Sequence, residues 1–301
     1  MKDLNIKPWT EFLGNEVLTV SQIVEKYKQH PSVLKIRENM PKNKVFSFQE
    51  TSIEDVVKKL SDLDVSKASP VESLPPKVLK ENCNIFAPKI MFDFNLSINS
   101  GNFPNSLKLA DVTPVFKKDD KHDKKKFRPV SILPALSKIY ERIMNGQIKA
   151  YFEDILSIFL GAFTKNMNSQ NCLLFMVEKW RKSLDKNGAC GILLTDLSKA
   201  FDCLNHQLLL AKLHAYGFDH LSLKVIQSYL SDRFQRVTVN ASFSGWKKIL
   251  TGVPQGSILG PELYNIYSND LFYFLVLDIV NYADDNSHFR VPSISHKFSI
   301  I

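Results

Sequence analysis

The chain of 301 residues is long enough to bury a sizeable core, and its 44% apolar and 23% charged residues exclude overall disorder. Lysine and arginine outnumber aspartate and glutamate by 39 to 31, and this net charge of +8 suits a polyanionic partner. The widely spaced cysteines form no CxxC pair, so we expect free thiols. The sequence shows neither a signal peptide nor an apolar span long enough for a transmembrane segment, so we expect an intracellular protein of the nucleus or cytoplasm.

The first 63 residues predict short helices. Residues 1–50 have helical character around 20–29 and a break at Pro41, so we expect a linker-like, mostly helical N-terminal segment. Thr51 and Glu54 then have the spacing of a capping box, and the apolar residues that follow recur at helical intervals to about 63.

The next elements lead to a dense run of charge. A loop with three prolines over 64–76 precedes a helix over 86–100, which Gly101 should close, and a strand over 110–116. Residues 117–128 hold six lysines and one arginine against three aspartates. This run has two interpretations, a solvated hairpin tip or a cationic finger that meets phosphates.

The second half of the chain interleaves strands and helices. A helix amphipathic through Ile139, Ile143 and Ile148 precedes a buried strand that ends at Asp196. The remaining predicted elements are a helix over 198–218 that stops at Gly217, a helix over 221–233, paired strands over 235–240 and 245–250, a turn over 251–261, a helix over 262–271 and a strand over 274–282. The hairpin signals favour an α+β sheet with helices on one face over a strict βαβ series.

Carboxylates follow two of the predicted strands. Asp196 ends one strand, and the adjacent Asp284 and Asp285 follow another, so neighbouring strands could bring them together. Such a cluster repels itself unless a cation occupies it, and Mg²⁺ is commonly held by a carboxylate or two together with substrate phosphates. In the alternative interpretation, Asp196 caps the next helix and the aspartate pair occupies a hairpin turn.

Three ordered motifs resemble a known family. The segments TDLSKAFD (195–202), TGVPQGSILGP (251–261) and NYADD (281–285) resemble successive palm motifs of reverse transcriptases, specifically jockey-like non-LTR retrotransposon enzymes. The segment over 112–144 resembles the fingers of that family, and the segment over 60–81 resembles the stretch ahead of them. The likeness covers roughly residues 50–287.

The resemblance implies a fold and an activity. The fold would be the fingers and palm of a right-hand polymerase over 51–285, with an antiparallel palm sheet that has helices on one face. Residues 286–301 would be an irregular truncated tail, and the thumb would be missing. The activity would be RNA-directed DNA synthesis, in which a primer 3′-hydroxyl attacks a dNTP with the help of two Mg²⁺ ions, or Mn²⁺ in their place. The partners would be an RNA template, a DNA primer and dNTPs, with no membrane.

The resemblance also implies residue roles. Asp196, Asp284 and Asp285 would be the catalytic metal ligands. Phe201 matches the position that closes on the sugar of the incoming nucleotide and excludes a ribose 2′-hydroxyl, whereas its alternative is a core aromatic residue. The residues that would bind the nucleotide, besides Phe201, are Gln255, Gly256, Arg128 and one lysine of the pair Lys117 and Lys118. For Asp202 and His206 we expect helix capping or packing.

The chain departs from the family pattern in several loops. Pro70-Val71-Glu72-Ser73 stands in place of a glycine-rich turn, 163–166 lacks an arginine and a glycine, and Asp119 replaces a glycine after the lysine pair. The alternative function is therefore an inactive remnant of a retrotransposon polymerase that at most binds nucleic acid.

Overall fold

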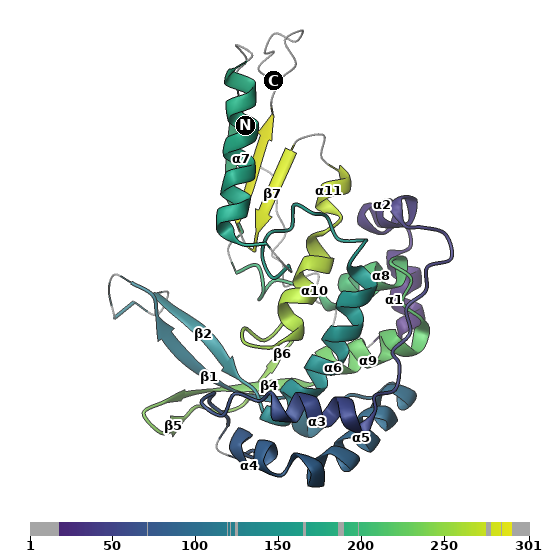
Figure 1. Cartoon of the computed structure of the whole chain (residues 1–301), viewed down its shortest axis with the longest axis vertical. Coiled ribbons are helices and arrows are strands. Elements are labelled where there is room, and N and C mark those ends of the chain that lie inside the picture. The colour runs from purple at the N-terminus through teal and green to yellow at the C-terminus, as the bar shows by residue number, and fades with distance from the viewer. Residues whose placement is uncertain are drawn as a thin grey trace.

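The computed structural model of the chain describes residues 18–290 apart from 71, 119, 121, 124–125, 165–166, 186–189, 198, 275–277 and 284. Helices and strands alternate in a mixed α+β order, as expected (Figure 1). The helices are α1 Val20–Tyr27, α2 Pro31–Asn39, α3 Ile53–Ser61, α4 Pro76–Glu81, α5 Cys83–Ser100, the 3₁₀ turn η2 Asn105–Leu107, α6 Ala135–Phe152, α7 Ser169–Leu184, α8 His206–Ala215, α9 His220–Leu230, α10 Leu259–Ser268 and α11 Leu271–Phe274. The strands are β1 Leu109–Phe116, β2 Phe127–Ile132, β3 Gly191–Asp196, β4 Arg233–Val239, β5 Ser242–Phe243, β6 Lys247–Ile249, β7 Asp278–Tyr282 and β8 Asp285–Arg290.

The strands form two separate sheets. The larger sheet has the order β2-β1-β4-β5, with β6 also paired to β4, and only its β1–β4 ladder is parallel. The smaller sheet has the order β3-β8-β7 and is antiparallel throughout. In Figure 1 the β1–β2 hairpin and β5 project to one side of the helical body, while α7 and the smaller sheet stand at the top.

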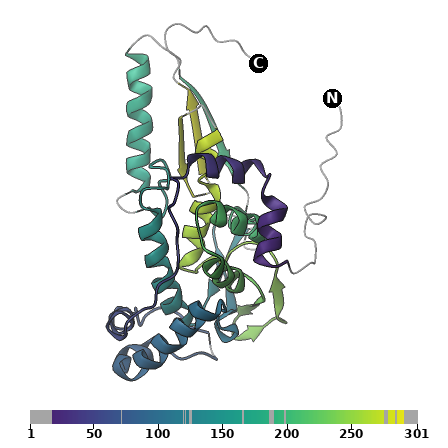
Figure 2. The ribbon, with the colours of Figure 1, turned by 90° about the vertical axis from the view of Figure 1, so that its right-hand side faces the viewer.

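The helical body is built around α6. The predicted apolar stripe is confirmed, because Ile139, Ile143 and Ile148 are all buried in one core that α3, α5, α8, α9 and α10 also supply. The same core includes residues of α1 and α2, which pack against α8 in the view of Figure 2. The domain boundary at residue 50 stays a prediction, but the two helices before it share the core of the body.

Four local predictions were wrong. Ser52 rather than Thr51 caps α3, since its side chain accepts from the N–H of Asp55 while Thr51 is buried. Residues 199–203 form turns, so the helix predicted from 198 begins only at His206. The strand β3 is exposed rather than buried, with Leu194 71% exposed. Phe274, where the last strand was expected to begin, instead ends the short helix α11, and the strand β7 is Asp278–Tyr282.

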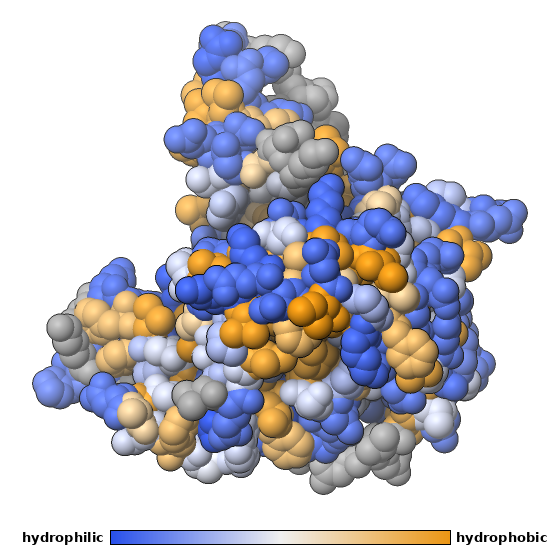
Figure 3. Space-filling model, turned by 60° about the horizontal axis from the view of Figure 1, so that its bottom comes forward, coloured by the Kyte–Doolittle hydropathy of each residue, from blue (hydrophilic) through white to orange (hydrophobic). Residues whose placement is uncertain are grey.

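The thiols, the helix hydropathy and one face of the surface complete the description. No disulfide joins any of the four cysteines, all of which lie within the described residues. None of the helices formed by the described residues combines the length and apolar character needed to cross a bilayer. The underside of the molecule mixes polar side chains with separate apolar patches, and one such mixture lies over the arm that carries β1, β2 and β5 (Figure 3).

Two glycines end helices where the sequence predicted. Gly101 follows α5 with φ +76°, and Gly217 follows α8 with φ +98°. At Gly217 a Cβ atom would lie 2.2 Å from the carbonyl oxygen of Lys44 and 2.7 Å from the hydroxyl of Tyr151. The chain therefore needs both the left-handed conformation and the space that only glycine provides here.

Substitution of Gly217 should destabilise the fold. We expect Gly217→Ala to lower the free energy of unfolding by roughly 2–3 kcal/mol, because the new methyl group adds steric overlap to left-handed strain. Gly146→Ala is the matched control: Gly146 lies within α6 with nothing within 4 Å of its would-be Cβ, and this change should raise stability by up to about 1 kcal/mol through helix propensity. Urea unfolding of both variants checks the pair, and equal effects at the two positions would contradict it.

Candidate active site

Two aspartates meet at the end of the smaller sheet. Asp196 is the last residue of β3, and its direct partner across the ladder is Asp285, the first residue of β8. Residues opposite each other on antiparallel strands project from the same face, with Cβ atoms about 4.5–5.5 Å apart. Both residues are exposed. Asp284 lies outside the described residues, so its part in the site stays a prediction.

This pair suits a hard cation. Carboxylate oxygens are ligands that Mg²⁺ prefers, and Mg²⁺ completes its coordination with water and substrate phosphates. Within the ranges that the structure describes, no group of three or more His, Cys, Asp and Glu side chains could hold a metal. Asp196 and Asp285 would therefore supply two of the ligands, with other oxygens from outside this described set.

The turn after β3 holds Phe201 in a cluster of rings. Its ring centroid lies 4.7 Å from that of Tyr264 and 6.1 Å from that of Phe163. Phe201 is half-buried and packs on the main core. This placement is compatible with a core aromatic residue and with a ring whose free edge meets a ligand, so both interpretations from the sequence stay open.

The turn around Gln255 is fixed against that same segment. The N–H groups of Gly252 and Val253 donate to the carbonyl oxygens of Leu204 and Phe201, at 2.8 and 3.0 Å. The Gln255 amide donates to a carboxylate oxygen of Asp202 at 3.0 Å. The turn is therefore held by backbone and side-chain bonds to the residues that closely follow Asp196.

The other side of this turn lies against the larger sheet. The carbonyl oxygen of Gln255 accepts from the N–H of Ser131 in β2 at 2.7 Å. Gly256 has φ +126°, and a Cβ atom there would lie 2.5 Å from the Ser131 carbonyl oxygen. The predicted nucleotide-binding residues Gln255 and Gly256 thus sit at the junction between β2 and the segment after β3.

The predicted cations lie on the β1–β2 hairpin. Arg128 is the cross-strand partner of Val115, and the backbone N–H of Lys117 donates to the carbonyl oxygen of Lys126. Arg128, Lys117 and Lys118 are all exposed. They belong to the larger sheet, whereas Asp196 and Asp285 belong to the smaller one (Figure 1). The turn at Gln255 bonds to β2, which carries Arg128.

Asp202 and His206 do not cap α8. Asn205 is the N-cap, and its side chain accepts from the N–H of Leu208. Asp202 instead accepts from Gln255, and Nε2 of His206 lies 2.6 Å from the carbonyl oxygen of Gly252. Of the two roles expected for these residues, capping or packing, the capping of α8 is excluded, and both side chains instead contact the turn over 252–255.

Glu141 is a residue beside the candidate site that was not predicted from the sequence. This fully buried residue of α6 accepts hydrogen bonds from the N–H groups of Ile258 and Leu259 and from the hydroxyl of Ser137. Burial raises the pKa of the Glu141 carboxyl group, while Arg233 and these donors oppose that shift. The available signal was a charged residue on the apolar face of the predicted helix, one turn after Ser137. Glu141 secures the chain directly after the Gln255 turn.

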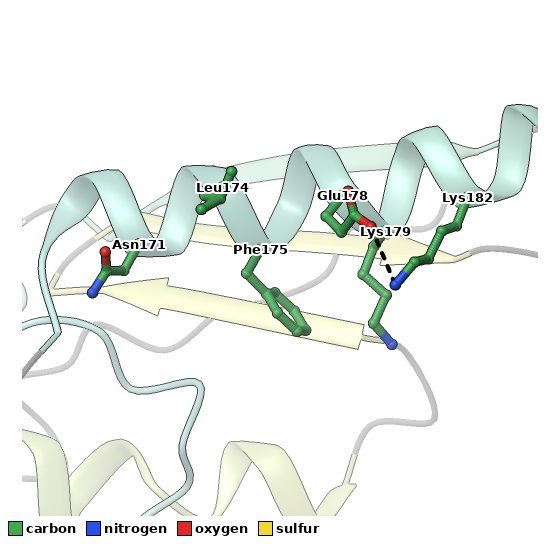
Figure 4. Close-up of a pocket in the computed structure, with 6 residues that line it drawn as sticks. All are labelled: Asn171, Leu174, Phe175, Glu178, Lys179 and Lys182. Atoms are coloured by element: carbon green, nitrogen blue, oxygen red, sulfur yellow. Dashed lines mark ion pairs between the residues drawn. The ribbon is translucent and has the colours of Figure 1, made fainter.

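A separate groove lies on α7. It encloses about 450 Å³ and is lined by the α7 residues Asn171, Leu174, Phe175, Glu178, Lys179 and Lys182 (Figure 4). An ion pair of 3.2 Å joins Glu178 and Lys182 along it. None of the residues predicted for the active site lines this groove, so it is separate from the candidate site.

Comparison with known proteins supports the resemblance seen in the sequence. A family profile described as "Reverse transcriptase (RNA-dependent DNA polymerase)" matches residues 116–289. The chain is 29% identical over 224 residues to the "RNA-directed DNA polymerase from mobile element jockey" of Drosophila melanogaster, covering 73% of this chain and 24% of that protein. It is 26% identical over 222 residues to the "Probable RNA-directed DNA polymerase from transposon BS" of the same species, again covering 73% and 24%. The chain thus spans about a quarter of the length of the curated relatives it matches.

Burial of His206 should make stability depend on pH. Burial lowers the pKa of His206, so the folded protein holds it neutral, and stability that is full above the ordinary value of about 6.5 is lost as the pH falls towards the lowered folded pKa. His206→Gln keeps an N–H donor but does not titrate. We expect this variant to lose roughly 1 kcal/mol less unfolding free energy than the parent between pH 7 and 5.

Urea unfolding at several pH values measures this difference. Some pH dependence should remain in the variant, because burial also lowers the pKa of His30 and His214. The matched control is His220→Gln, at an exposed position at the start of α9. A parent and a His206→Gln variant with parallel curves would contradict the assignment.

Proposed function

The chain belongs to the reverse transcriptase (RNA-dependent DNA polymerase) family, and we propose that it provides the polymerase unit that extends a DNA primer along an RNA template. The observation that carries the proposal is the cross-strand pairing of Asp196 with Asp285 at the end of the smaller sheet. In this proposal residues 51–285 form fingers and palm: the larger sheet with its hairpin belongs to the fingers, and the smaller sheet belongs to the palm. The palm then continues past residue 285, because β8 Asp285–Arg290 is a strand of the smaller sheet where an irregular tail was expected.

The carboxylates of Asp196 and Asp285, together with Asp284, would hold two Mg²⁺ ions. When bound, these ions lower the pKa of the attacking primer hydroxyl and neutralise charge on the leaving pyrophosphate. The contribution of the chain is to fix the carboxylates. The β3–β8 ladder sets the spacing of Asp196 and Asp285, and their exposure lets substrate oxygens reach them.

The segment over 199–206 and the Gln255 turn would hold the nucleotide. Phe201 lies within the turns that follow β3 and Asp196, and Tyr264 supports its ring from one side. A ring held in this way excludes a 2′-hydroxyl by volume. Gln255 and Gly256 would lie along the base pair that forms, because the bond from Gln255 to Asp202 fixes the turn beside Phe201.

The hairpin cations would bind the triphosphate. Arg128 offers a planar fork that can donate to two phosphate oxygens at once, which suits a chain of phosphates better than a single ammonium group does. Lys117 and Lys118 start the hairpin tip close to it, since Phe116 pairs with Phe127. One of these lysines would add a second positive charge.

Loss of any one of the three aspartates should nearly abolish DNA synthesis. With an RNA template, a DNA primer, dNTPs and Mg²⁺, we expect the chain to extend the primer, and Asp196→Asn, Asp284→Asn or Asp285→Asn to reduce the rate roughly 1,000-fold or more, because each amide removes a metal-binding charge. Asp154→Asn, at an exposed position after α6, is the control and should keep full activity. Gel-resolved extension products measure the rates. Absence of extension by the parent chain, with nucleic-acid binding intact, would favour the inactive remnant.

Substitution of Phe201 should relax sugar selection. We expect Phe201→Ala to raise the use of ribonucleotides relative to deoxynucleotides by roughly 10- to 200-fold, since a steric pocket discriminates by about that factor. Phe163→Ala removes a neighbouring ring from the same cluster and serves as the matched control, with selectivity unchanged. Single-nucleotide incorporation with dNTP and NTP pairs measures the ratio. Equal selectivity in the parent and Phe201→Ala would leave the core interpretation of this ring.

A further inference from the structure

A β-bulge places a tryptophan over the larger sheet. In the β4 ladder, Ser244 bonds to Val237 and Lys247 is the partner of Gln235. Only Arg236 lies between Gln235 and Val237, whereas Gly245 and Trp246 lie between Ser244 and Lys247. Gly245 and Trp246 therefore stand opposite the single residue Arg236, which defines a β-bulge. Bulges redirect side chains and recur beside functional sites.

Trp246 and Phe243 both stack on Arg236. The guanidinium carbon of Arg236 lies 4.2 Å from the Phe243 ring centroid and 4.6 Å from the Trp246 ring centroid. The guanidinium group is itself fixed, because its Nε donates to buried Asp111 at 2.7 Å and an NH group donates to Glu72 at 3.3 Å. The two rings thus contact a guanidinium group that two carboxylates, those of Asp111 and Glu72, hold in place.

The rings nevertheless stay open to solvent. Trp246 is 41% exposed and Phe243 is 45% exposed. A two-residue turn, in which Asn240 and Ala241 both have positive φ, sets the register that places Phe243 opposite Thr238. Large aromatic side chains left half-exposed on a fixed support form a ready stacking surface.

The same face of the sheet carries Arg128. Strand partners project to one side, and along a strand every second residue does so. Arg236 is the partner of Asp111, and Arg128 is the partner of Val115, four residues further along β1. The aromatic pair and the exposed arginine at the hairpin therefore lie on a common face, with Lys117 and Lys118 at its outer end.

We propose that Trp246 and Phe243, held by Arg236, form a stacking platform for an unpaired nucleic-acid strand. This inference rests on the proposed function, because the strand would be the template beyond the pair being formed. Flat rings stack on any base, and nearby cations hold the backbone, which is the combination that binds single strands without reading their sequence. The positive charge on this face favours a polyanion over an apolar protein segment as the occupant.

Binding of short oligonucleotides tests the platform without any need for catalysis. With 20-nucleotide labelled RNA and DNA single strands and the full chain, we expect Trp246→Ala to weaken binding roughly 5- to 150-fold, the range for loss of one stacked base. Phe243→Ala should act in the same direction. Leu174→Ala, which removes an exposed apolar side chain on α7, is the matched control and should leave affinity unchanged.

Salt dependence separates stacking from simple attraction. Trp246→Ala removes no charge, so the slope of log affinity against log salt should match that of the parent, whereas Arg128→Ala should reduce that slope. Blunt duplex of the same length should bind the parent and Trp246→Ala equally, because its bases are not available for stacking.

Three results would overturn the proposal. They are equal single-strand affinity of the parent and Trp246→Ala, an equal loss for duplex and single strand, and a change in self-association of the protein with no change in oligonucleotide binding, which would assign the rings to a protein contact. Failure of primer extension alongside the expected binding differences would count against the polymerase activity and leave the platform standing.

Discussion

The close backbone packing of the turn over 252–256 is the constraint that joins the two parts of the candidate site. A methyl group at Gly252 would lie 2.6 Å from the carbonyl oxygen of Phe201, and one at Gly256 would lie 2.5 Å from that of Ser131. One short turn therefore touches the segment that follows Asp196 and the strand β2 that carries Arg128. Because peptide groups make these contacts, the position of the proposed metal ligands relative to the proposed phosphate-binding cations depends little on side-chain rotamers.

A buried carboxylate on α6 also helps to hold this turn in place. The carboxylate of Glu141 accepts from the N–H groups of Ile258 and Leu259, where α10 begins and its unpaired donors and dipole favour an anion. Removing that carboxylate would leave two donors without their partner, at a cost of about 1–3 kcal/mol for each buried group. Burial of the charge is itself costly, so its value lies in fixing one geometry of the turn. Its bonds hold α6, α10 and the turn in a single register.

Sequence patterns foresaw the elements whose environment is decided locally. The apolar stripe of α6, the alternation in β4 and the glycines after α5 and α8 each carry their own signal, and the structure has all of them. The errors lie where distant contacts decide. Residues 199–203 look helical, but the carbonyl groups of Phe201 and Leu204 accept from the N–H groups of Val253 and Gly252 instead of continuing a helix into α8. An apolar run such as β3 gives no indication of what covers it. Strand ends and motif order predicted that Asp196 and the aspartate pair 284–285 lie near each other, but not that Asp285 is the direct partner of Asp196. The partners of Glu141 and the bulge at Trp246 likewise depend on distant contacts.

The exposure of β3 bears on the chemistry proposed for its last residue, Asp196. An edge strand with Leu193 and Leu194 in solvent is a liability, because free backbone groups and apolar side chains invite pairing with other chains. The same edge position leaves Asp196 exposed, as the proposed contact with metal ions and a polyanionic substrate requires. Among the described residues, the ladder to β8 and Asp285 fixes this end of β3. In the proposed reaction, substrate oxygens would reach Asp196 from its exposed side.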